Sequence, residues 1–165
     1  MFCGTCGKEL PDNYDIASTT ALDLQYQDIT DDDLKGIAKL TNLNELHLGS
    51  NQICDIAPLT ALTKLTYLFL TGNQISDIAP LTGLTNLAYL DSENNQISVI
   101  TPLSCLTDLR TLHLKGNQIR DIITPLSGLA DLTNLFLDHN QISDSDKEQL
   151  KAKLPKCDLH FNYGA

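Results

Sequence analysis

The hydrophobic positions of this chain repeat every 22 residues, with one interval lengthened to 23. Most copies contain the pattern L-x-L-x-x-N, seen as LHLGSN, LFLTGN, LHLKGN and LFLDHN. Alternating apolar positions predict short strands, and a period of this length predicts a solenoid of stacked turns. The repeat asparagines are Asn51, Asn73, Asn95, Asn117, Asn140 and Asn162, and a less regular copy at residues 22–29 brings the number of rungs to seven.

The alternate leucines of each strand, such as Leu46 and Leu48, are expected to point into the molecule. A single turn cannot bury them, so consecutive turns must stack into a parallel sheet with about 4.8 Å between rungs. An inward asparagine amide has both donors and acceptors, and we expect it to bond backbone groups that the bend after each strand leaves unpaired. The asparagine ladder is therefore interpreted as structural and not catalytic.

The fourth rung breaks the leucine pattern, because it reads LDSEN. We expect a weak point of the core at Ser92, since a hydroxyl loses the apolar burial that a leucine provides. The residues predicted to fill the equivalent position in the other rungs are Leu24, Leu48, Leu70, Leu114, Leu137 and Leu159.

The segments that return between the strands carry a proline at the same place in four rungs. Proline removes a backbone donor and disfavours helix just before it, so this side is expected to consist of short turns or 3₁₀ segments. A repeated aspartate in these segments is interpreted as turn chemistry. The prolines are Pro58, Pro80, Pro102 and Pro125, and the aspartates are Asp55, Asp77, Asp121 and Asp144.

The end rungs read as longer helices, over residues 31–40 and 145–154, which are predicted to cap the stack. The second is expected to open with a capping box formed by Ser145 and Glu148. We expect an N-terminal CxxC segment and cap over residues 1–20, followed by one repeat domain over residues 21–165.

The repeat, close to LTNLxxLxLxxNQISDIxPL, resembles the short 22-residue leucine-rich repeat of bacterial internalins and of a eukaryotic phosphatase regulatory subunit. The resemblance covers about residues 21–165. It implies an α/β fold, a curved right-handed leucine-rich-repeat solenoid with a parallel β-sheet on its concave face and short 3₁₀ or turn segments on its convex face. It also implies that the concave sheet binds another protein.

Composition and charge exclude several classes of partner. Of the 165 residues, 42% are hydrophobic and 19% charged, so the chain is expected to fold. Its formal net charge of −10 argues against nucleic acid, because phosphate backbones attract basic proteins. The apolar runs are far below the ~20 residues that cross a bilayer, so no membrane partner is expected. Residues 1–10 lack the apolar stretch of a signal peptide, and with Met1 as the true start we expect a cytoplasmic protein.

Ten of the thirteen Phe, Tyr and His side chains fall at positions expected to point outward on the sheet. The alternative explanation is β-propensity, because aromatic residues favour strands. That preference does not explain why all four histidines fall on one surface, and we favour a protein-binding face. The ten residues are Tyr26, His47, Tyr67, Phe69, Tyr89, His113, Phe136, His139, His160 and Phe161.

Two clusters are predicted on this face. A partner is expected to bring an apolar anchor surrounded by Lys or Arg, since the nearest cation on the face is Lys115. A metal site in the second cluster is the other interpretation, but no motif places three ligands on one centre. The first cluster contains His47, Tyr67, Phe69 and Tyr89, bordered by Glu45, Asp91 and Glu93. The second contains His113, Phe136, Asp138, His139, Asp158 and His160, with Asp138 and His160 expected in one column of adjoining rungs.

Before the repeats, Cys3 and Cys6 in MFCGTCGKELP resemble the first knuckle of a bacterial zinc ribbon. A closed structural zinc site needs four ligands, and this segment supplies two. Three interpretations stay open: a vestigial knuckle, a four-thiolate zinc site completed by a second chain, and a redox pair. We expect a monomer, or a dimer where a second chain completes the zinc site. Cys157 is expected to occupy an inward leucine position of the last rung.

The sequence contains no Gly-rich phosphate loop, nucleophile elbow or His-Glu-x-x-His motif, so an enzyme is not expected. The predicted function is a non-enzymatic module that binds a protein partner through the concave sheet, without a resident cofactor. The alternative is a metal-binding or thiol-redox protein that uses Cys3 and Cys6, with the solenoid as scaffold.

Overall fold

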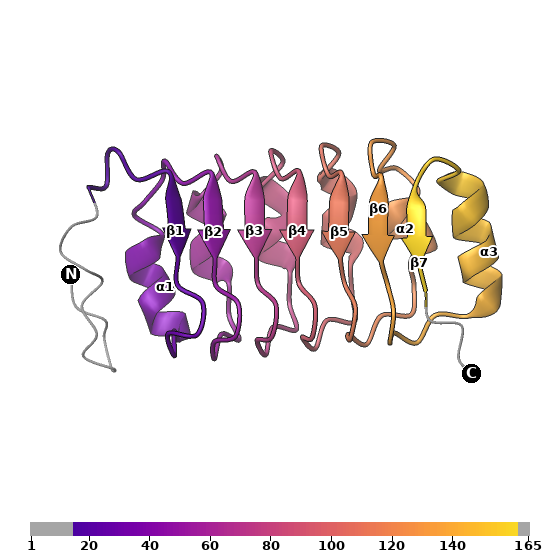
Figure 1. Ribbon diagram of the computed structural model, residues 1–165, viewed down its shortest axis with the longest axis horizontal. Helices are drawn as coiled ribbons and strands as arrows, with labels where there is room; N and C mark the ends of the chain where they lie inside the picture. Colours follow the sequence, from indigo (N-terminus) through magenta and orange to yellow (C-terminus); the bar gives the residue numbers. More distant parts are fainter. Residues whose placement is uncertain (1–14, 162–165) are drawn as a thin grey trace.

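The structure is a computed structural model that describes residues 15–161. Seven strands form one open parallel sheet, in the same order in space as in the sequence. Figure 1 shows them in a nearly straight row, and the chain returns behind the sheet to advance one rung at a time in a right-handed sense. The predicted solenoid with a parallel sheet is confirmed, but the sheet is open and nearly straight and lacks the curvature that the resemblance implies. The strands are β1 (Ala21–Asp23), β2 (Glu45–His47), β3 (Tyr67–Phe69), β4 (Tyr89–Asp91), β5 (Thr111–His113), β6 (Asn134–Phe136) and β7 (Asp158–His160).

The middle residue of every strand is a leucine, and each pairs in register with the leucine of the next strand. Leu46, Leu68 and Leu90 are fully buried. Their neighbours Glu45 and His47 lie on the opposite face and are half-buried. Because successive side chains of a strand alternate between faces, the period of two in the sequence builds a core on one side of the sheet and an exposed face on the other.

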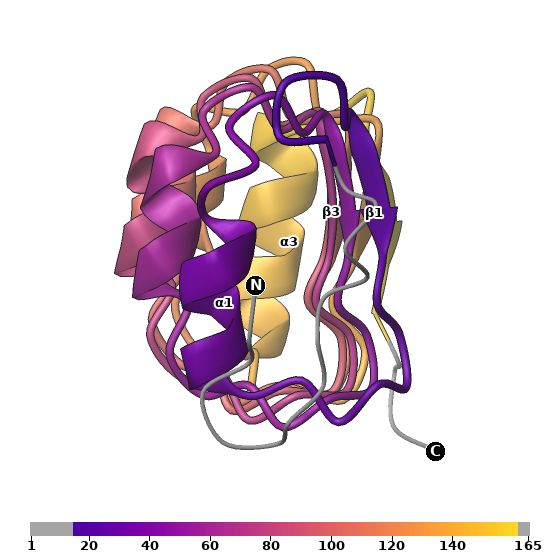
Figure 2. The same cartoon turned by 90° about the vertical axis from the view of Figure 1, so that its left-hand side faces the viewer.

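The layer behind the sheet consists of short 3₁₀ helices and one α-helical turn, as the prolines predict. Figure 2, viewed from the N-terminal end, shows these segments across the core from the strands. Asp55 Oδ1 accepts a hydrogen bond from Ala57 N and Asp77 Oδ1 accepts one from Ala79 N, both at 2.8 Å, which confirms turn chemistry for these two aspartates. The segments are η1 (Ala57–Ala61), η2 (Ala79–Gly83), η3 (Thr101–Cys105) and α2 (Ile123–Leu126).

Helices α1 (Asp31–Ile37) and α3 (Asp144–Lys153) cover the two ends of the row. Helix α1 ends earlier than predicted. After Ile37 the backbone hydrogen bonds change from the α-helical spacing of four residues to a spacing of three, and Leu40 N donates to Ile37 O at 2.9 Å. No helix within residues 15–161 is both long enough and apolar enough to span a bilayer.

The predicted capping box of the last helix is wrong by two residues. Ser143, with an extended backbone, is the N-cap of α3, and its Oγ accepts a hydrogen bond from Asp146 N at 3.1 Å. Ser145 already lies inside the first turn, where its backbone is helical and cannot act as a cap.

The asparagine ladder is structural, as predicted, at the five described positions. Asn95 shows the pattern: its Oδ1 accepts from Ile75 N at 3.0 Å, and its Nδ2 donates to Leu70 O at 3.0 Å and to Ser92 O at 3.3 Å. Each asparagine therefore joins its own rung to the preceding one. The equivalent bonds are made by Asn51, Asn73, Asn117 and Asn140, while Asn162 lies outside the described residues.

The residue before each ladder asparagine has a left-handed backbone, which the repeat pattern alone does not reveal. Gly116 has φ of 69°, and a Cβ added there would lie 2.4 Å from Asn94 Oδ1. Glycine is therefore favoured at this position by both conformation and space. Asn94 itself has φ of 52°, and Ser50 and His139 have φ of 55° and 56°. These residues accept a strained conformation that the turn requires.

The last rung is placed differently from the prediction. Leu135 pairs with Leu159, so Leu159 continues the middle column and is not the equivalent of Ser92. That equivalent position falls to Phe161, which is 8% exposed and belongs to the core, so its predicted place on the outward surface is also wrong. The physical reason is the ten-residue helix α3, which lengthens the connection and shifts the register of the motif. Cys157 packs against the core, but the inward leucine position predicted for it is taken by Leu159, and Cys157 precedes β7.

Ser92 is the defect in the core that the sequence indicates. It is 1% exposed, and its Oγ has no hydrogen-bond partner within the described part of the chain. Leu70 and Leu114, the residues at the same position of the neighbouring rungs, are fully buried. An unpaired hydroxyl in such surroundings destabilises the fold.

Candidate functional site

Three columns of side chains make up the exposed face of the sheet from β2 to β7, which we call the sheet face. Two columns are the first and third residues of the strands, which pair in register. The backbone bonding continues past the strands, with Gly72 N donating to Glu93 O and Gly116 N donating to Asp138 O, and adds a third column. That third column includes Thr71, Glu93, Lys115 and Asp138.

Six rings form a continuous line across the sheet face, perpendicular to the strands. His47 stacks on Phe69 with ring centroids 4.1 Å apart, and His113 stacks on Phe136 at 4.2 Å. Phe136 also stacks on the ring of the last strand, His160, at 4.2 Å. We call this line the ring band, and its members are His47, Phe69, Tyr89, His113, Phe136 and His160.

Tyr89 joins the two clusters that the sequence predicts as separate. The third position of β4 holds Asp91 in place of a ring, which leaves a gap in that column. Tyr89, from the neighbouring column, closes the gap because its ring lies 4.8 Å from Phe69 and 5.4 Å from His113. Tyr67 lies 6.3 Å from Tyr89 and is 46% exposed, so it widens the aromatic surface at one side.

Three carboxylates hold the histidines of the ring band. Glu45 Oε1 lies 2.7 Å from His47 Nε2, and Glu93 Oε1 lies 3.1 Å from His113 Nδ1. Asp158 Oδ2 lies 3.3 Å from the Nε2 of the histidine on the same strand. The two hydrogen bonds orient the imidazoles of His47 and His113, and all three contacts place a carboxylate beside the rings.

Asp91 and Tyr89 have further contacts that order the middle of the sheet face. Asp91 Oδ1 accepts hydrogen bonds from the hydroxyl of Thr71 and, at 3.1 Å, from Glu93 N. Burial raises the pKa of Tyr89, and the carboxylates of Asp91 and Glu93 raise it further. The phenol is therefore neutral at physiological pH, as an uncharged contact surface requires.

Two predicted site residues lie away from the ring band. Asp138 is half-buried in the third column, beyond the end of β6. The column predicted to hold Asp138 with His160 is wrong, because His160 pairs with Phe136 in the shifted last rung. His139 is exposed in the left-handed turn that follows.

The described residues do not form a metal cluster, and one of their thiols is poorly reactive. Within residues 15–161 no three His, Cys, Asp or Glu side chains come together as a metal ion requires. Cys54 and Cys105 are exposed, while burial and the charge of Asp158 raise the pKa of Cys157 to about 11. A thiol with such a pKa stays protonated at neutral pH and is a poor nucleophile. The predicted zinc ligands Cys3 and Cys6 lie outside the described residues.

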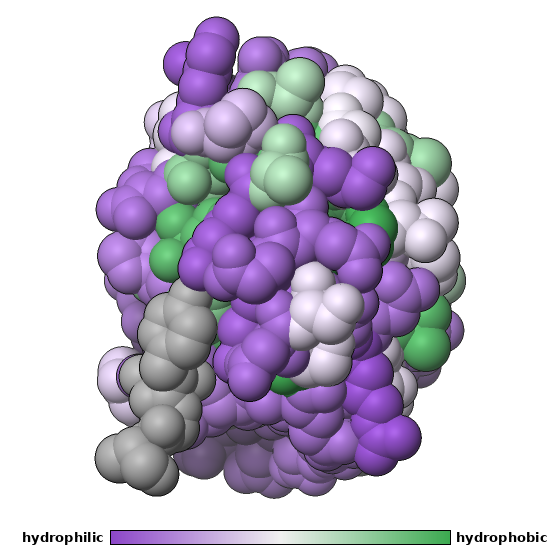
Figure 3. Space-filling model, turned by 90° about the vertical axis from the view of Figure 1, so that its right-hand side faces the viewer, coloured by the Kyte–Doolittle hydropathy of each residue, from purple (hydrophilic) through white to green (hydrophobic). Residues whose placement is uncertain are grey.

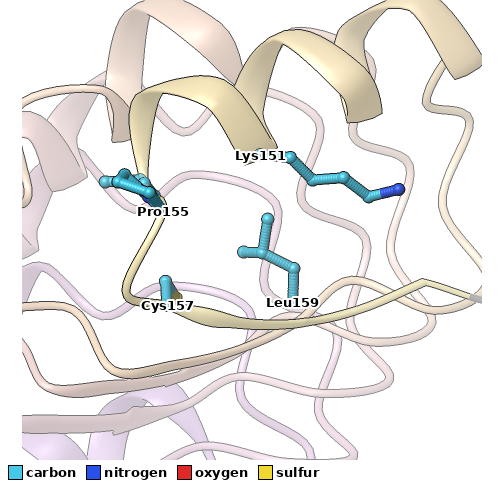
Figure 4. Close-up of a pocket in the computed structure, with 5 residues that line it drawn as sticks. Lys151, Pro155, Cys157 and Leu159 are labelled. Carbon is cyan, nitrogen blue, oxygen red and sulfur yellow. The ribbon is translucent and has the colours of Figure 1, made fainter.

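Two shallow hollows lie at the C-terminal end, away from the ring band. One of about 250 Å³ opens between α3 and β7, where Figure 4 shows Cys157 and Leu159 below the helix and Pro155 at its end. The other, of about 230 Å³, shares Leu154, Pro155 and Cys157 with it. Figure 3 shows that this end of the molecule is mostly hydrophilic. Neither hollow brings together a set of convergent polar groups.

Comparison with known proteins agrees with this architecture. A leucine rich repeat family model matches residues 17–75 and 63–119. Internalin C2 from Listeria monocytogenes is 42% identical with a TM-score of 0.72, over 78% of this chain and 55% of that chain. A second internalin of that organism, inlF, is 39% identical with a TM-score of 0.71, over 79% of this chain and 38% of that chain.

A leucine-rich-repeat protein from Leptospira interrogans is 33% identical with a TM-score of 0.72, over 77% of this chain and 33% of that chain. The chain therefore spans between one third and about half of the length of these three proteins. The search of curated proteins gave no match. The family match over more than half of the chain, together with the stacked parallel strands, shows that the protein belongs to the leucine-rich-repeat family, with internalin-like repeats.

Proposed function

We propose that the protein is a non-enzymatic module that binds a protein partner through the sheet face, with the ring band at the centre of the contact. Leucine-rich-repeat domains are in general scaffolds for protein–protein interaction, and their extended sheets provide the binding surface. The ring band is the observation that supports this role for the chain.

The rings are arranged as interface hot spots are. Aromatic side chains give a large contact area, and they are enriched where binding energy concentrates. In this chain stacking and carboxylate contacts already order the rings, so a partner loses little of its binding free energy to immobilising them. The flanking carboxylates favour an apolar anchor surrounded by Lys or Arg.

Titration of an isolated partner tests the proposal. The partner is captured by chemical cross-linking in the native cell lysate, identified and purified. Its affinity is then measured for the unmodified chain and for Phe69→Ala and Tyr89→Ala. Each substitution is expected to cost about 2 kcal/mol of binding free energy, because it removes a central ring of the contact.

Tyr26→Ala is the matched control, since Tyr26 is 76% exposed in a turn outside the ring band. It is expected to leave the affinity unchanged. Thermal unfolding of all three variants checks that the fold is intact. Undiminished affinity in both Phe69→Ala and Tyr89→Ala would show that the partner uses another surface.

A further inference from the structure

The charges on the sheet face are almost all negative. Among the described residues of its three columns from β2 to β7, one lysine, Lys115, stands against five carboxylates. Two of them, Glu45 and Glu93, are hydrogen-bonded to histidines of the ring band, and Asp158 lies 3.3 Å from the Nε2 of His160, so these three carboxylates are held beside the band before any partner arrives. A charge that is already ordered binds a cation with little further loss of entropy. The five are Glu45, Asp91, Glu93, Asp138 and Asp158.

The stacking of the rings decides which groups can approach them. The planes of His47 and Phe69 differ by 12°, and those of Phe136 and His160 by 6°, so these rings cover one another's faces. Their edges point away from the sheet, because side chains stand roughly perpendicular to it. Cations bind ring faces and not ring edges, so along the stacked rings the carboxylates beside the band are the better partners for a cation. Apolar groups and carbonyl oxygens suit the edges.

The backbone of the sheet adds no attachment points on this face. Strands β2 to β6 are each paired on both sides, so their N–H and C=O groups are already bonded. A partner therefore recognises side chains, and it cannot bind there by adding a strand.

The three carboxylates that contact histidines lie along the band at two unequal intervals, with Glu45 and Asp158 in the first column and Glu93 in the third. Glu45 is on β2, Glu93 in the rung of β4 and Asp158 on β7. At about 4.8 Å per strand they are about 10 Å and about 14 Å apart along the row. An extended chain advances about 3.3 Å per residue, so these intervals equal about three and about four residues. The whole band, about 24 Å long, matches a segment of about seven residues.

We propose that the occupant of the sheet face is an extended basic peptide segment of the partner, which lies along the ring band across the strands. Its Lys or Arg side chains, about three and then about four residues apart, pair with Glu45, Glu93 and Asp158. Apolar side chains between them contact the ring edges. This inference rests on the proposed function and names the kind of partner that the same face takes.

Selection from a phage-displayed random dodecapeptide library on the immobilised full chain tests the inference. Enriched peptides are expected to carry Lys or Arg at intervals of three and four residues, interspersed with apolar residues. One enriched peptide is then synthesised and titrated. The Kd is expected to rise about tenfold or more in the triple variant Glu45→Gln/Glu93→Gln/Asp158→Asn, and to rise with salt for the unmodified chain.

Asp108→Asn is the matched control for loss of a carboxylate, because Asp108 is exposed in a turn and Asn86 fills the equivalent place one rung earlier. It is expected to leave the Kd unchanged. Thermal unfolding shows whether the triple variant keeps its fold, and each single variant is titrated if it does not.

Enriched peptides without basic residues, or a Kd that is unchanged in the carboxylate variants, would overturn the inference. If no peptide binds while Phe69→Ala still weakens the isolated protein partner, the inference fails and the proposed function stands. If Phe69→Ala and Tyr89→Ala affect neither peptide nor partner, both fail.

Discussion

The third rung (residues 67–88) and the fourth rung (residues 89–110) have nearly the same backbone but different side chains at four key places. The residue before the 3₁₀ helix has φ and ψ of −110° and 13° at Ile78, and −116° and 13° at Ile100. Both rungs carry a ladder asparagine, Asn73 or Asn95, that makes equivalent bonds to the preceding rung. The pairs that differ are Phe69 and Asp91, Leu70 and Ser92, Gly72 and Asn94, and Asp77 and Val99.

Each of these differences removes from the fourth rung a feature that the third rung has. The fourth rung has no ring at the third strand position, no leucine at the Ser92 position and no glycine in the left-handed turn. It also lacks the aspartate that accepts a hydrogen bond at the start of the 3₁₀ helix. Its conformation is nevertheless kept, because each rung of a solenoid is stabilised by its interfaces with two neighbours. The comparison teaches that the neighbours and the asparagine ladder determine the shape of a rung more than its own side chains do.

Placing the fourth-rung serine in the third rung, Leu70→Ser, has the largest expected effect. The substitution removes a fully buried side chain and adds a hydroxyl without a partner. We expect a loss of about 4 kcal/mol in the free energy of unfolding. Urea denaturation measures it, with Leu70→Met as a control that costs less than about 1.5 kcal/mol. A loss below about 1 kcal/mol would mean that a rung closes around the smaller side chain.

Removal of a ladder amide is expected to cost the same in both rungs. Asn73→Ala and Asn95→Ala each leave buried backbone groups unpaired, at about 2 to 3 kcal/mol per site. Asn51→Ala should cost less, because Asn51 is half-buried and water can reach the groups that it bonds. Urea denaturation of the three variants gives the values. Equal losses at all three sites would contradict a ladder that depends on burial.

Ser92→Leu, the reverse exchange, is expected to stabilise the protein. A leucine there restores apolar contact with Leu70 and Leu114 and removes the unpaired hydroxyl. The expected gain is about 1.5 to 2 kcal/mol, seen as a higher denaturation midpoint. A lower midpoint would show that the space beside Ser92 cannot hold the larger side chain.

Val99→Asp has the smallest expected effect. Asp77 accepts a hydrogen bond from Ala79 N in the turn that opens the 3₁₀ helix of the third rung, and Val99 stands at the same position, 61% exposed. An aspartate should gain about 0.5 to 1 kcal/mol, and Asp77→Val should lose a similar amount. Differential scanning calorimetry of both variants measures the changes. Opposite signs from those expected would rule out capping as the role of this aspartate.

The repeating parts of the fold follow from the sequence because each is set by spacing within a rung. Alternating leucines determine which face of a strand is buried, and a proline near the start of each return segment favours a 3₁₀ helix. The structural role of the ladder asparagines can also be predicted from the sequence, because an inward amide at a bend has to bond backbone groups. The spacing also puts the rings of both predicted clusters on the outward face of the sheet, except His139, which lies in the turn after β6.

The sequence by itself determined the solenoid, its number of rungs and, in the regular rungs, which side chains its exposed face carries, because these depend on a repeated period. Only the tertiary structure decided the register of the last rung and the continuity of the ring band. The shift that buries Phe161 depends on how helix α3 packs at the end of the stack. The bridge between the clusters depends on the direction in which the Tyr89 ring leans across the gap at Asp91. Side-chain direction is settled by packing against neighbouring rungs, which no spacing along the chain specifies.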